Sequence, residues 1–199
     1  MPASVLYYLR HGETDWNVEA RLQGRRDIPL NARGREQASH CGEVLRDLFA
    51  RDGIDPTALD YVSSPLGRAR ETMELARGVL GLGPDGYRLL DELTEISFGT
   101  WEGSTIAEMR ARDANGVAAR EHDKWHFLPP GGESYEAVSA RMSAWYTSLT
   151  RDTVATAHGG TARGLMAALG IAKPAAAPMI DIEQGVIYVF KGETLTRYA

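Results

Sequence analysis

Residues 6–17 read LYYLRHGETDWN, an apolar and aromatic run that stops abruptly at Arg10-His11-Gly12. A run of this composition predicts a β-strand over Val5–Leu9. A cation, an imidazole and a glycine follow this strand with barely a turn residue between them. What these three residues do depends on the fold to which the strand belongs.

The rest of the chain alternates between strand-like and helical patterns. Further strands are predicted at Tyr61–Ser63, Tyr87–Leu90, Thr153–Ala157 and Val186–Phe190, with an additional strand at Thr194–Tyr198 as an option. Helical patterns between them cover about Arg33–Arg51, Leu66–Leu80, Thr105–Arg112, Ser134–Leu149 and Gly160–Leu169. This alternation predicts an α/β fold, a three-layer α/β/α sandwich with a mostly parallel central sheet, whose last strands could form an antiparallel edge.

Length and composition limit the function classes. The 199 residues predict one domain over residues 1–199, with a core large enough to be stable without disulfide bonds or bound metal ions. The formal net charge of −5 argues against nucleic acid as a partner. Cys41 is the only cysteine, which favours the cytoplasm. There is no signal-peptide pattern and no apolar run of membrane-spanning length, so we expect no membrane partner.

Two segments stand out from this ordinary composition. Arginines gather at positions 21, 25, 26, 33 and 35, either as a solvated face or as a rim that attracts anions. Asn115–Glu133 has no predicted element and is long for a loop, which indicates a functional or partly helical segment.

Three predicted strand ends carry residues that suit an anionic ligand. They are Arg10-His11-Gly12, the segment SSPLGRARET at 63–72, and His158-Gly159-Gly160. Ligands of open α/β sheets gather at the carboxyl ends of the strands, and a helix N-terminus offers free N–H groups. Arg68 and Arg70 are two positions apart on a helix, so only one of them should face the site. The collection suits a phosphoryl group.

The opening stretch then acquires a chemical interpretation. Arg10 supplies a permanently charged fork for phosphate oxygens, and His11 beside it can accept the phosphoryl group as a nucleophile. Gly12 is expected to leave the approach to His11 unobstructed. Covalent transfer to the imidazole divides one difficult hydrolysis into two easier steps.

Other patterns carry less weight. GLGPDG, residues 81–86, fits a dinucleotide-binding motif, but it follows a helix and contains Pro84, so we interpret it as a turn. His122, Asp123 and His126 could share a helix face, yet no third histidine or cysteine lies nearby, and no metal is expected.

The aromatic residues are divided between site and core. Trp125 and Phe127 are expected to pack over the site and to help choose the substrate. Trp16 and Trp101 could belong to the core or to the pocket wall, and the core is favoured for both.

Six motifs together resemble one family. They are LRHGET (9–14), LQGRRDIPLNARGREQA (22–38), SSPLGRARET (63–72), LTEISFGTWEG (93–103), PPGGES (129–134) and AHGGTARGL (157–165). In this order, the set resembles the histidine phosphatase superfamily, also called phosphoglycerate mutase-like, and covers most of the chain. The resemblance implies that family's fold and a phosphatase of its phosphatase branch.

The resemblance also implies roles for individual residues. His11 corresponds to the phosphorylated nucleophile, and Glu95 to the proton donor for the leaving alcohol, which later helps to activate water. Glu102 corresponds to a structural position. The groups that bind the phosphate correspond to Arg10, Arg68, His158, Asn17 and the Gly159 N–H. The residues that border the rest of the substrate correspond to Gln23 and Gly24.

We therefore expect a phosphomonoester hydrolase that needs no cofactor or metal and acts on a small molecule; a homodimer is left open. A mutase is the first alternative, but mutases carry a longer insertion and a histidine near the acid, where this chain has Ile96-Ser97-Phe98-Gly99. A catalytically weak phospho-ligand-binding protein is the second alternative.

The proposed roles require particular protonation states. His11 must be neutral to attack, and nearby Arg10 and Arg68 should lower its pKa, whereas Glu95 must first carry a proton.

Overall fold

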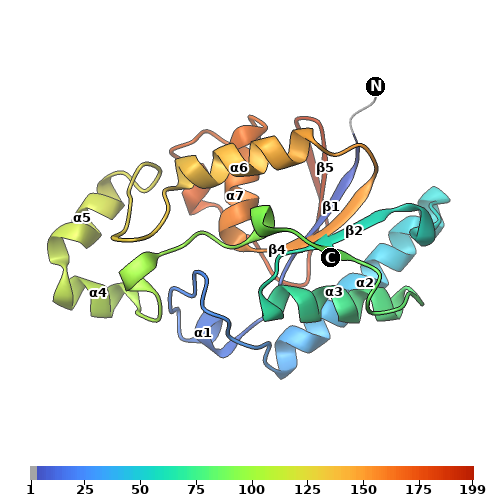
Figure 1. Cartoon of the computed structure of the whole chain (residues 1–199), viewed down its shortest axis with the longest axis horizontal. Helices are drawn as coiled ribbons and strands as arrows, with labels where there is room; N and C mark the ends of the chain where they lie inside the picture. The colour runs from blue at the N-terminus through green and yellow to red at the C-terminus, as the bar shows by residue number, and fades with distance from the viewer. Residues whose placement is uncertain (1–3) are drawn as a thin grey trace.

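The computed structural model describes residues 4–199 around a six-stranded sheet with the order β3-β2-β4-β1-β5-β6. The strands are β1 (Leu6–Arg10), β2 (Asp60–Ser63), β3 (Arg88–Leu89), β4 (Thr153–Ala157), β5 (Ile187–Lys191) and β6 (Thr194–Tyr198). The first four strands in the sheet order are parallel, whereas β5 is antiparallel to β1 and β6 to β5 (Figure 1). The predicted α/β fold and its antiparallel edge are confirmed.

Two pairs of helices cover the two faces of this sheet. The helices α2 (Ala32–Asp52) and α3 (Gly67–Val79) lie on one face, and α6 (Tyr135–Thr147) and α7 (Gly159–Ala168) on the other (Figure 1). Successive side chains of a strand point to opposite faces, so Tyr7 and Leu9 join the α2/α3 core while Leu6 and Tyr8 join the α6/α7 core. A strand buried on both faces needs apolar residues at every position, which explains the continuous run in β1.

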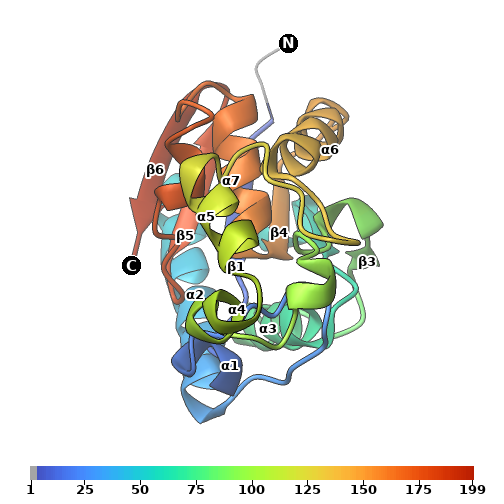
Figure 2. The same cartoon turned by 90° about the vertical axis from the view of Figure 1, so that its left-hand side faces the viewer.

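Three helices lie outside these layers. They are α1 (Asp15–Val18), α4 (Ile106–Arg112) and α5 (Ala114–His122), and α4 and α5 project from one end of the sandwich (Figures 1 and 2). Short 3-10 turns occupy Pro56–Ala58, Asp91–Leu93, Gly99–Trp101 and Ala177–Met179. Within residues 4–199 no helix is both long enough and apolar enough to cross a membrane.

The helix α5 fills much of the segment for which no element was predicted. Asp113 caps it by accepting the Gly116 N–H at 2.8 Å, and Val117 packs against Trp101 and Met109. The partly helical alternative for Asn115–Glu133 is therefore the correct one. The assignment of Trp101 to the core is also confirmed, because this side chain is 2% exposed.

Gly12 has a different role from the one expected. A Cβ at this position would lie 2.8 Å from the Cα of Gly34 and closer still to its carbonyl oxygen. The loop after β1 therefore packs directly on the first turn of α2, and a side chain at Gly12 would separate them. The prediction that Gly12 clears the approach to His11 is wrong, since the space it leaves is filled by protein backbone.

Candidate active site

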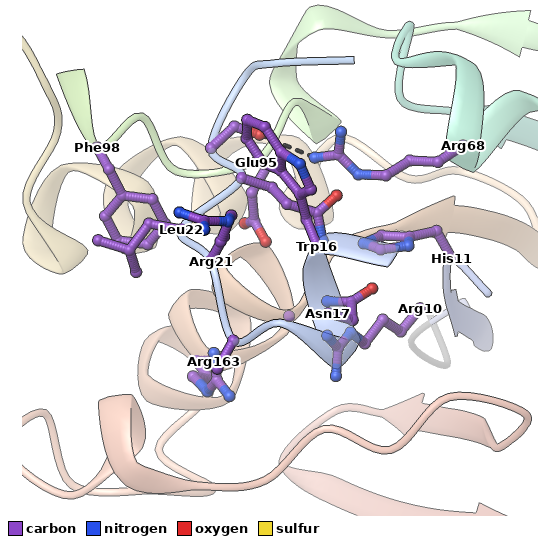
Figure 3. A pocket seen from close by; sticks show the side chains of 14 residues that line it. Arg10, His11, Trp16, Asn17, Arg21, Leu22, Arg68, Glu95, Phe98 and Arg163 are labelled. Atoms are coloured by element: carbon purple, nitrogen blue, oxygen red, sulfur yellow. Dashed lines mark hydrogen bonds between the residues drawn. The ribbon is translucent and has the colours of Figure 1, made fainter. Parts of the chain in front are cut away.

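A pocket of about 220 Å³ opens where the parallel strands end. Its wall contains eight of the nine predicted site residues: Arg10, His11, Asn17, Gln23, Gly24, Arg68, Glu95 and Gly159 (Figure 3). The ninth, His158, lies directly behind His11, with the two ring centroids 5.2 Å apart. This proximity follows from the sheet, because Arg10 pairs with Ala157 in the register of β1 and β4, which places the next residue of each strand side by side.

One nitrogen of the His11 ring is fixed by the backbone. Its Nδ1 lies 2.7 Å from the carbonyl oxygen of Gly12, and because a carbonyl only accepts, Nδ1 must carry the proton. The lone pair is then on Nε2. Burial, with further contributions from Arg68 and Arg10, holds the pKa of His11 well below its ordinary value of 6.5. The ring is therefore neutral at neutral pH, as predicted, and the lone pair of Nε2 is not used in a hydrogen bond among the described residues.

His158 is held in a similar way by Ser64, the residue after β2. The Nε2 of His158 lies 2.7 Å from Ser64 Oγ, and we assign the hydroxyl as the donor because its proton has no other acceptor among the described residues. The Nδ1 of His158 then carries a proton, and this buried atom has no hydrogen-bond partner within residues 4–199. Burial, followed by nearby Arg68 and His11, lowers the pKa of His158 well below 6.5.

Two arginines present further unpaired donors. Arg68 is completely buried, and its Nη1 and Nη2 donate to the carbonyls of Arg26 and Gly24 at 2.6 and 2.8 Å, while its Nε has no partner. Arg10 donates from Nη1 to Ile182 at 2.5 Å, and its Nε is likewise buried and unpaired. Arg70 is exposed, so one arginine of the pair faces the site, as predicted.

Unpaired buried donors are rare in folded proteins because each costs the desolvation of a polar group. Here three of them, on Arg10, Arg68 and His158, belong to side chains around one pocket. Together with the His11 ring, which lines the same pocket, they form a cradle for a strongly charged acceptor. A phosphoryl group has three oxygens to occupy it.

The loop after β1 supplies the remaining polar wall. The Oδ1 of Asn17 accepts from the Thr14 N–H at 3.1 Å and from Gln184 Nε2 at 3.0 Å, so its Nδ2 is left for a ligand. Gln23 is 7% exposed, and its Oε1 is buried without a partner. Gly24 adopts φ +53°, and its carbonyl holds Arg68, so it lines the pocket and also positions the arginine.

Glu95 enters the pocket from the segment after the third strand. Its Oε1 accepts the N–H of Ile96 at 2.9 Å, and its Oε2 accepts the N–H of Gly160 at 3.2 Å. This places the carboxyl group in the wall of the same pocket as His11. Glu102 is structural, as expected: its Oε1 accepts from Ser97, Phe98 and Arg25, all at 3.1 Å, and ties two loops together.

The outer wall differs from the prediction in its aromatic residues. Trp16 lines the pocket and is half-buried, so the pocket-wall alternative is the correct one for this residue and the favoured core assignment is wrong. Trp125 and Phe127 do not line it: Trp125 stacks on Tyr135 at 6.5 Å between centroids, and Phe127 packs on Trp101 at 5.1 Å. Both therefore anchor the segment after α5 in the cores.

The arginine-rich segment is mostly a paired surface. Arg21 lines the pocket but is bound to Glu19 at 2.6 Å and Glu108 at 2.8 Å. Ion pairs to acids also hold Arg25, Arg33 and Arg35. Of the two alternatives for this segment, the charged face describes it better than the anion-attracting rim.

Arg163 is the charged residue of the pocket wall that sequence reasoning missed. It lies on α7, four positions after Gly159, and residues with this spacing share a helix face. That spacing was the available signal. Its Nε donates to the Ile180 carbonyl at 2.7 Å, and Figure 3 shows it at the side of the pocket away from Arg68.

Over residues 4–199, no three histidine, cysteine, aspartate or glutamate side chains gather in a way that could hold a metal ion. His126 instead forms an ion pair with Asp123 at 2.7 Å, outside the end of α5.

Comparisons with known proteins agree with this geometry. Over 184 residues the chain is 37% identical to the glucosyl-3-phosphoglycerate phosphatase of Mycobacterium tuberculosis, covering 85% of this chain and 76% of that one. It is 28% identical over 196 residues to 2,3-bisphosphoglycerate-dependent phosphoglycerate mutase 2 of Gloeobacter violaceus, covering 94% and 85%. The alpha-ribazole phosphatase of Shigella flexneri has a similar structure, with a TM-score of 0.79 at 27% identity over 93% of this chain and 89% of that one. Since the family model also matches residues 6–195, the chain belongs to branch 1 of the histidine phosphatase superfamily.

Proposed function

We propose that this protein hydrolyses phosphomonoesters without a metal, through a phosphohistidine on His11. The observation that carries the proposal is the free Nε2 of His11 beside three buried, unpaired donors on Arg10, Arg68 and His158. A nucleophile in this position faces a phosphorus atom whose oxygens the donors bind.

In the first step the phosphate lies among Arg10, Arg68, His158, the Asn17 amide and the Gly159 N–H. The lone pair of His11 Nε2 forms a bond to phosphorus while the ester P–O bond breaks, and its electron pair leaves with the alcohol oxygen. Glu95 gives its proton to that oxygen, so a neutral alcohol departs.

In the second step water attacks the phosphorus of the phosphohistidine. The Glu95 carboxylate takes a proton from this water, the P–N bond breaks, and its electron pair returns to His11 Nε2. Phosphate leaves, and both residues regain their starting states. The fixed charges of Arg10 and Arg68 stabilise the transition state of each step because they are oriented before the reaction begins.

Hydrolysis is favoured over mutase activity by the relatives and by the pocket wall. Of the two relatives described above, the phosphatase shares 37% identity with this chain and the mutase 28%. Trp16, Arg21, Phe98 and Glu95 are all partly exposed, so water has access to the place where the phosphohistidine forms. A mutase must instead shelter this intermediate from water.

The test uses an aryl phosphate in the presence of a chelator. Wild type should hydrolyse the aryl phosphate, and His11→Ala should lose all measurable activity. With an alkyl phosphate, whose leaving group needs a proton, Glu95→Gln should be slower than wild type by roughly 10²- to 10⁴-fold. His40→Ala, an exposed histidine on α2, is the matched control. Activity that persists in His11→Ala, or requires a metal, contradicts the proposal. Interconversion of phosphoglycerates with a bisphosphorylated primer, faster than hydrolysis, would identify a mutase.

A further inference from the structure

Three cationic side chains are attached to one short segment beside the pocket. Lys124 Nζ donates to the Pro178 carbonyl at 2.8 Å, Arg163 Nε to Ile180 at 2.7 Å, and Arg10 Nη1 to Ile182 at 2.5 Å. These carbonyls belong to every second residue of 178–182. The segment thus holds a row of positive charges that starts at the phosphate cradle and continues away from it.

This row has no acidic partner in direct contact, although the charges of Glu95 and Asp181 act on Arg10 from farther away. In the part of the chain that the structure describes, no carboxylate lies within 4 Å of the charged nitrogens of Arg10, Arg163 or Lys124, or of Arg120 on α5. Arg21, in the wall of the same pocket, is by contrast bound to two glutamates.

A narrow crevice next to the pocket contains two of these cations. Arg120 and Lys124 line it, together with Phe98, which belongs to both cavities, and Tyr135, whose hydroxyl lies 3.4 Å from Arg163 Nη1. Glu133 is the one acid in the crevice wall, and Arg25 and Arg141 already pair with it.

The first cation after the cradle faces the same space as Arg10. A Cβ built on Gly159 would lie 3.4 Å from Arg163 Nη1 and 3.6 Å from Arg10 Nε, so both guanidinium groups border one point in the pocket. Two like charges so close repel each other unless an anion lies between or beside them.

The charges exceed what one phosphate requires. Arg10 and Arg68 balance the two negative charges of a phosphomonoester dianion. Glu121 offsets part of the charge of Arg120 but is itself paired with Arg110, so Arg163 and Lys124 are the cations left without a carboxylate within 4 Å among the described residues. Burial and the neighbouring Arg120 and Arg163 lower the pKa of Lys124 to about 8, which reflects how crowded this positive region is. Burying unpaired cations costs stability, and an anionic ligand offsets that cost when it binds.

We propose that Arg163, with Arg120 and Lys124 beyond it, forms a second anion subsite, and that the leaving alcohol of the substrate carries a further anionic group. This inference rests on the proposed function. The pocket of about 220 Å³ suits a small substrate whose second group, a carboxylate or a phosphate, lies a few bonds from the scissile ester.

Matched esters test the subsite. 3-Phosphoglycerate and glycerol 3-phosphate differ only by a carboxylate in place of a hydroxymethyl group, so the ratio of their kcat/KM values isolates the added charge. The ratio should be about 10 to 100 in favour of the acid in wild type and should fall by about the same factor in Arg163→Gln. The kcat/KM values of fructose 1,6-bisphosphate and fructose 6-phosphate test a second phosphate in the same way. A higher kcat/KM for the more acidic ester in either pair supports the proposal.

Two further variants separate this role from a general one. Arg21→Gln removes a pocket arginine that already has acidic partners and should change both esters of a pair alike. Lys124→Met removes the positive charge but retains a long apolar side chain, and it should lower the ratio of kcat/KM for the acidic ester to that for the neutral ester severalfold. Lys124 lies near Arg120 of α5 and Arg163 of α7, and it loses its proton above about pH 8. In wild type, kcat/KM for the acidic ester should therefore decline above this pH, and Lys124→Met should remove the decline.

Two results would overturn the subsite without contradicting the proposed phosphatase activity. One is equal kcat/KM values within both pairs, and the other is an Arg163→Gln variant that slows the acidic and neutral esters equally. If no ester is hydrolysed, the proposed function fails, and calorimetry still tests the subsite. 3-Phosphoglycerate should then bind wild type at least tenfold more tightly than glycerol 3-phosphate, and equal dissociation constants overturn the inference.

Discussion

Gly160→Ala should disable the acid without touching an acidic side chain. Gly160 is in the first turn of α7, where its N–H binds Glu95 Oε2. A Cβ added here would lie 2.6 Å from the Cγ2 of Ile96 and closer still to Glu95 Oε1, whereas ordinary contacts begin near 3.4 Å. The carboxyl group therefore has to move by about 1 Å, and Ile96 by about 0.8 Å.

A displacement of this size is enough to separate the proton from the leaving oxygen. Misplacing a reacting group by about 1 Å costs on the order of 10²-fold in rate, within the roughly 10²- to 10⁴-fold that a general acid contributes. We expect kcat for glycerol 3-phosphate to fall about 100-fold. The overpacking should also lower the free energy of unfolding by about 1–2 kcal/mol, partly offset because alanine suits a helix better than glycine.

The assay compares two leaving groups. p-Nitrophenolate departs without a proton, so Gly160→Ala should slow p-nitrophenyl phosphate far less than glycerol 3-phosphate. The double variant with Glu95→Gln should be no slower than Glu95→Gln alone, because both changes remove the same proton transfer. Equal losses with both esters, or losses that multiply in the double variant, would refute the reasoning.

Three other perturbations follow from the same geometry. Arg68→Gln removes a buried charged donor and should lower kcat/KM roughly 10²- to 10³-fold in steady-state assays; a loss below tenfold contradicts its place in the cradle. Because the pKa values of His11 and His158 are held well below 6.5, the free energy of unfolding should be highest above pH 6.5. It should fall as the pH drops below 6.5, by up to about 1.4 kcal/mol per pH unit for each ring, since only the unfolded chain takes up these protons; urea titrations should show a shallower decline in His11→Asn, and equal slopes contradict this. Gly12→Ala should lower the free energy of unfolding by about 2–3 kcal/mol, measured with urea, because its Cβ meets the backbone of Gly34; a change under about 0.5 kcal/mol shows that the two loops can separate freely.

The strands and the cradle could be predicted because their signals are local. β1 is buried on both faces, so its sequence is apolar throughout, and its end is marked by the change to Arg10-His11. Parallel strands then bring their carboxyl ends to one edge, which places His11, His158 and Arg68 together without knowledge of any particular contact.

The charges around the pocket could not be assigned in the same way. Arginines 21–35 are neighbours in the sequence, but most of them point to separate acids. Arg120 on α5 and Lys124 just after it are four positions apart, but Arg163 on α7 follows Lys124 by 39 positions, and only the fold brings the three together. Whether a cation is free or paired is decided by tertiary contacts, and a cluster in the sequence does not reveal it.

Packing roles were hidden for the same reason. Gly12 is required by Gly34, 22 positions later, and not by the ligand. The helix α5 contains Asn115-Gly116, a pair typical of turns, and forms because Asp113 caps it and Val117 is buried against Trp101. In each case a distant contact overrides the local pattern.

The most direct test of the account is the position of the phosphoryl group during turnover. Wild type mixed rapidly with a ³²P-labelled phosphomonoester and quenched in alkali, in which phosphohistidine survives, should carry label on the peptide that contains His11. The label should appear no later than the alcohol product, and NMR of the peptide should place it on Nε2, since Gly12 occupies Nδ1. Alcohol released in the first turnover without label on His11, or label on Nδ1, would contradict the account.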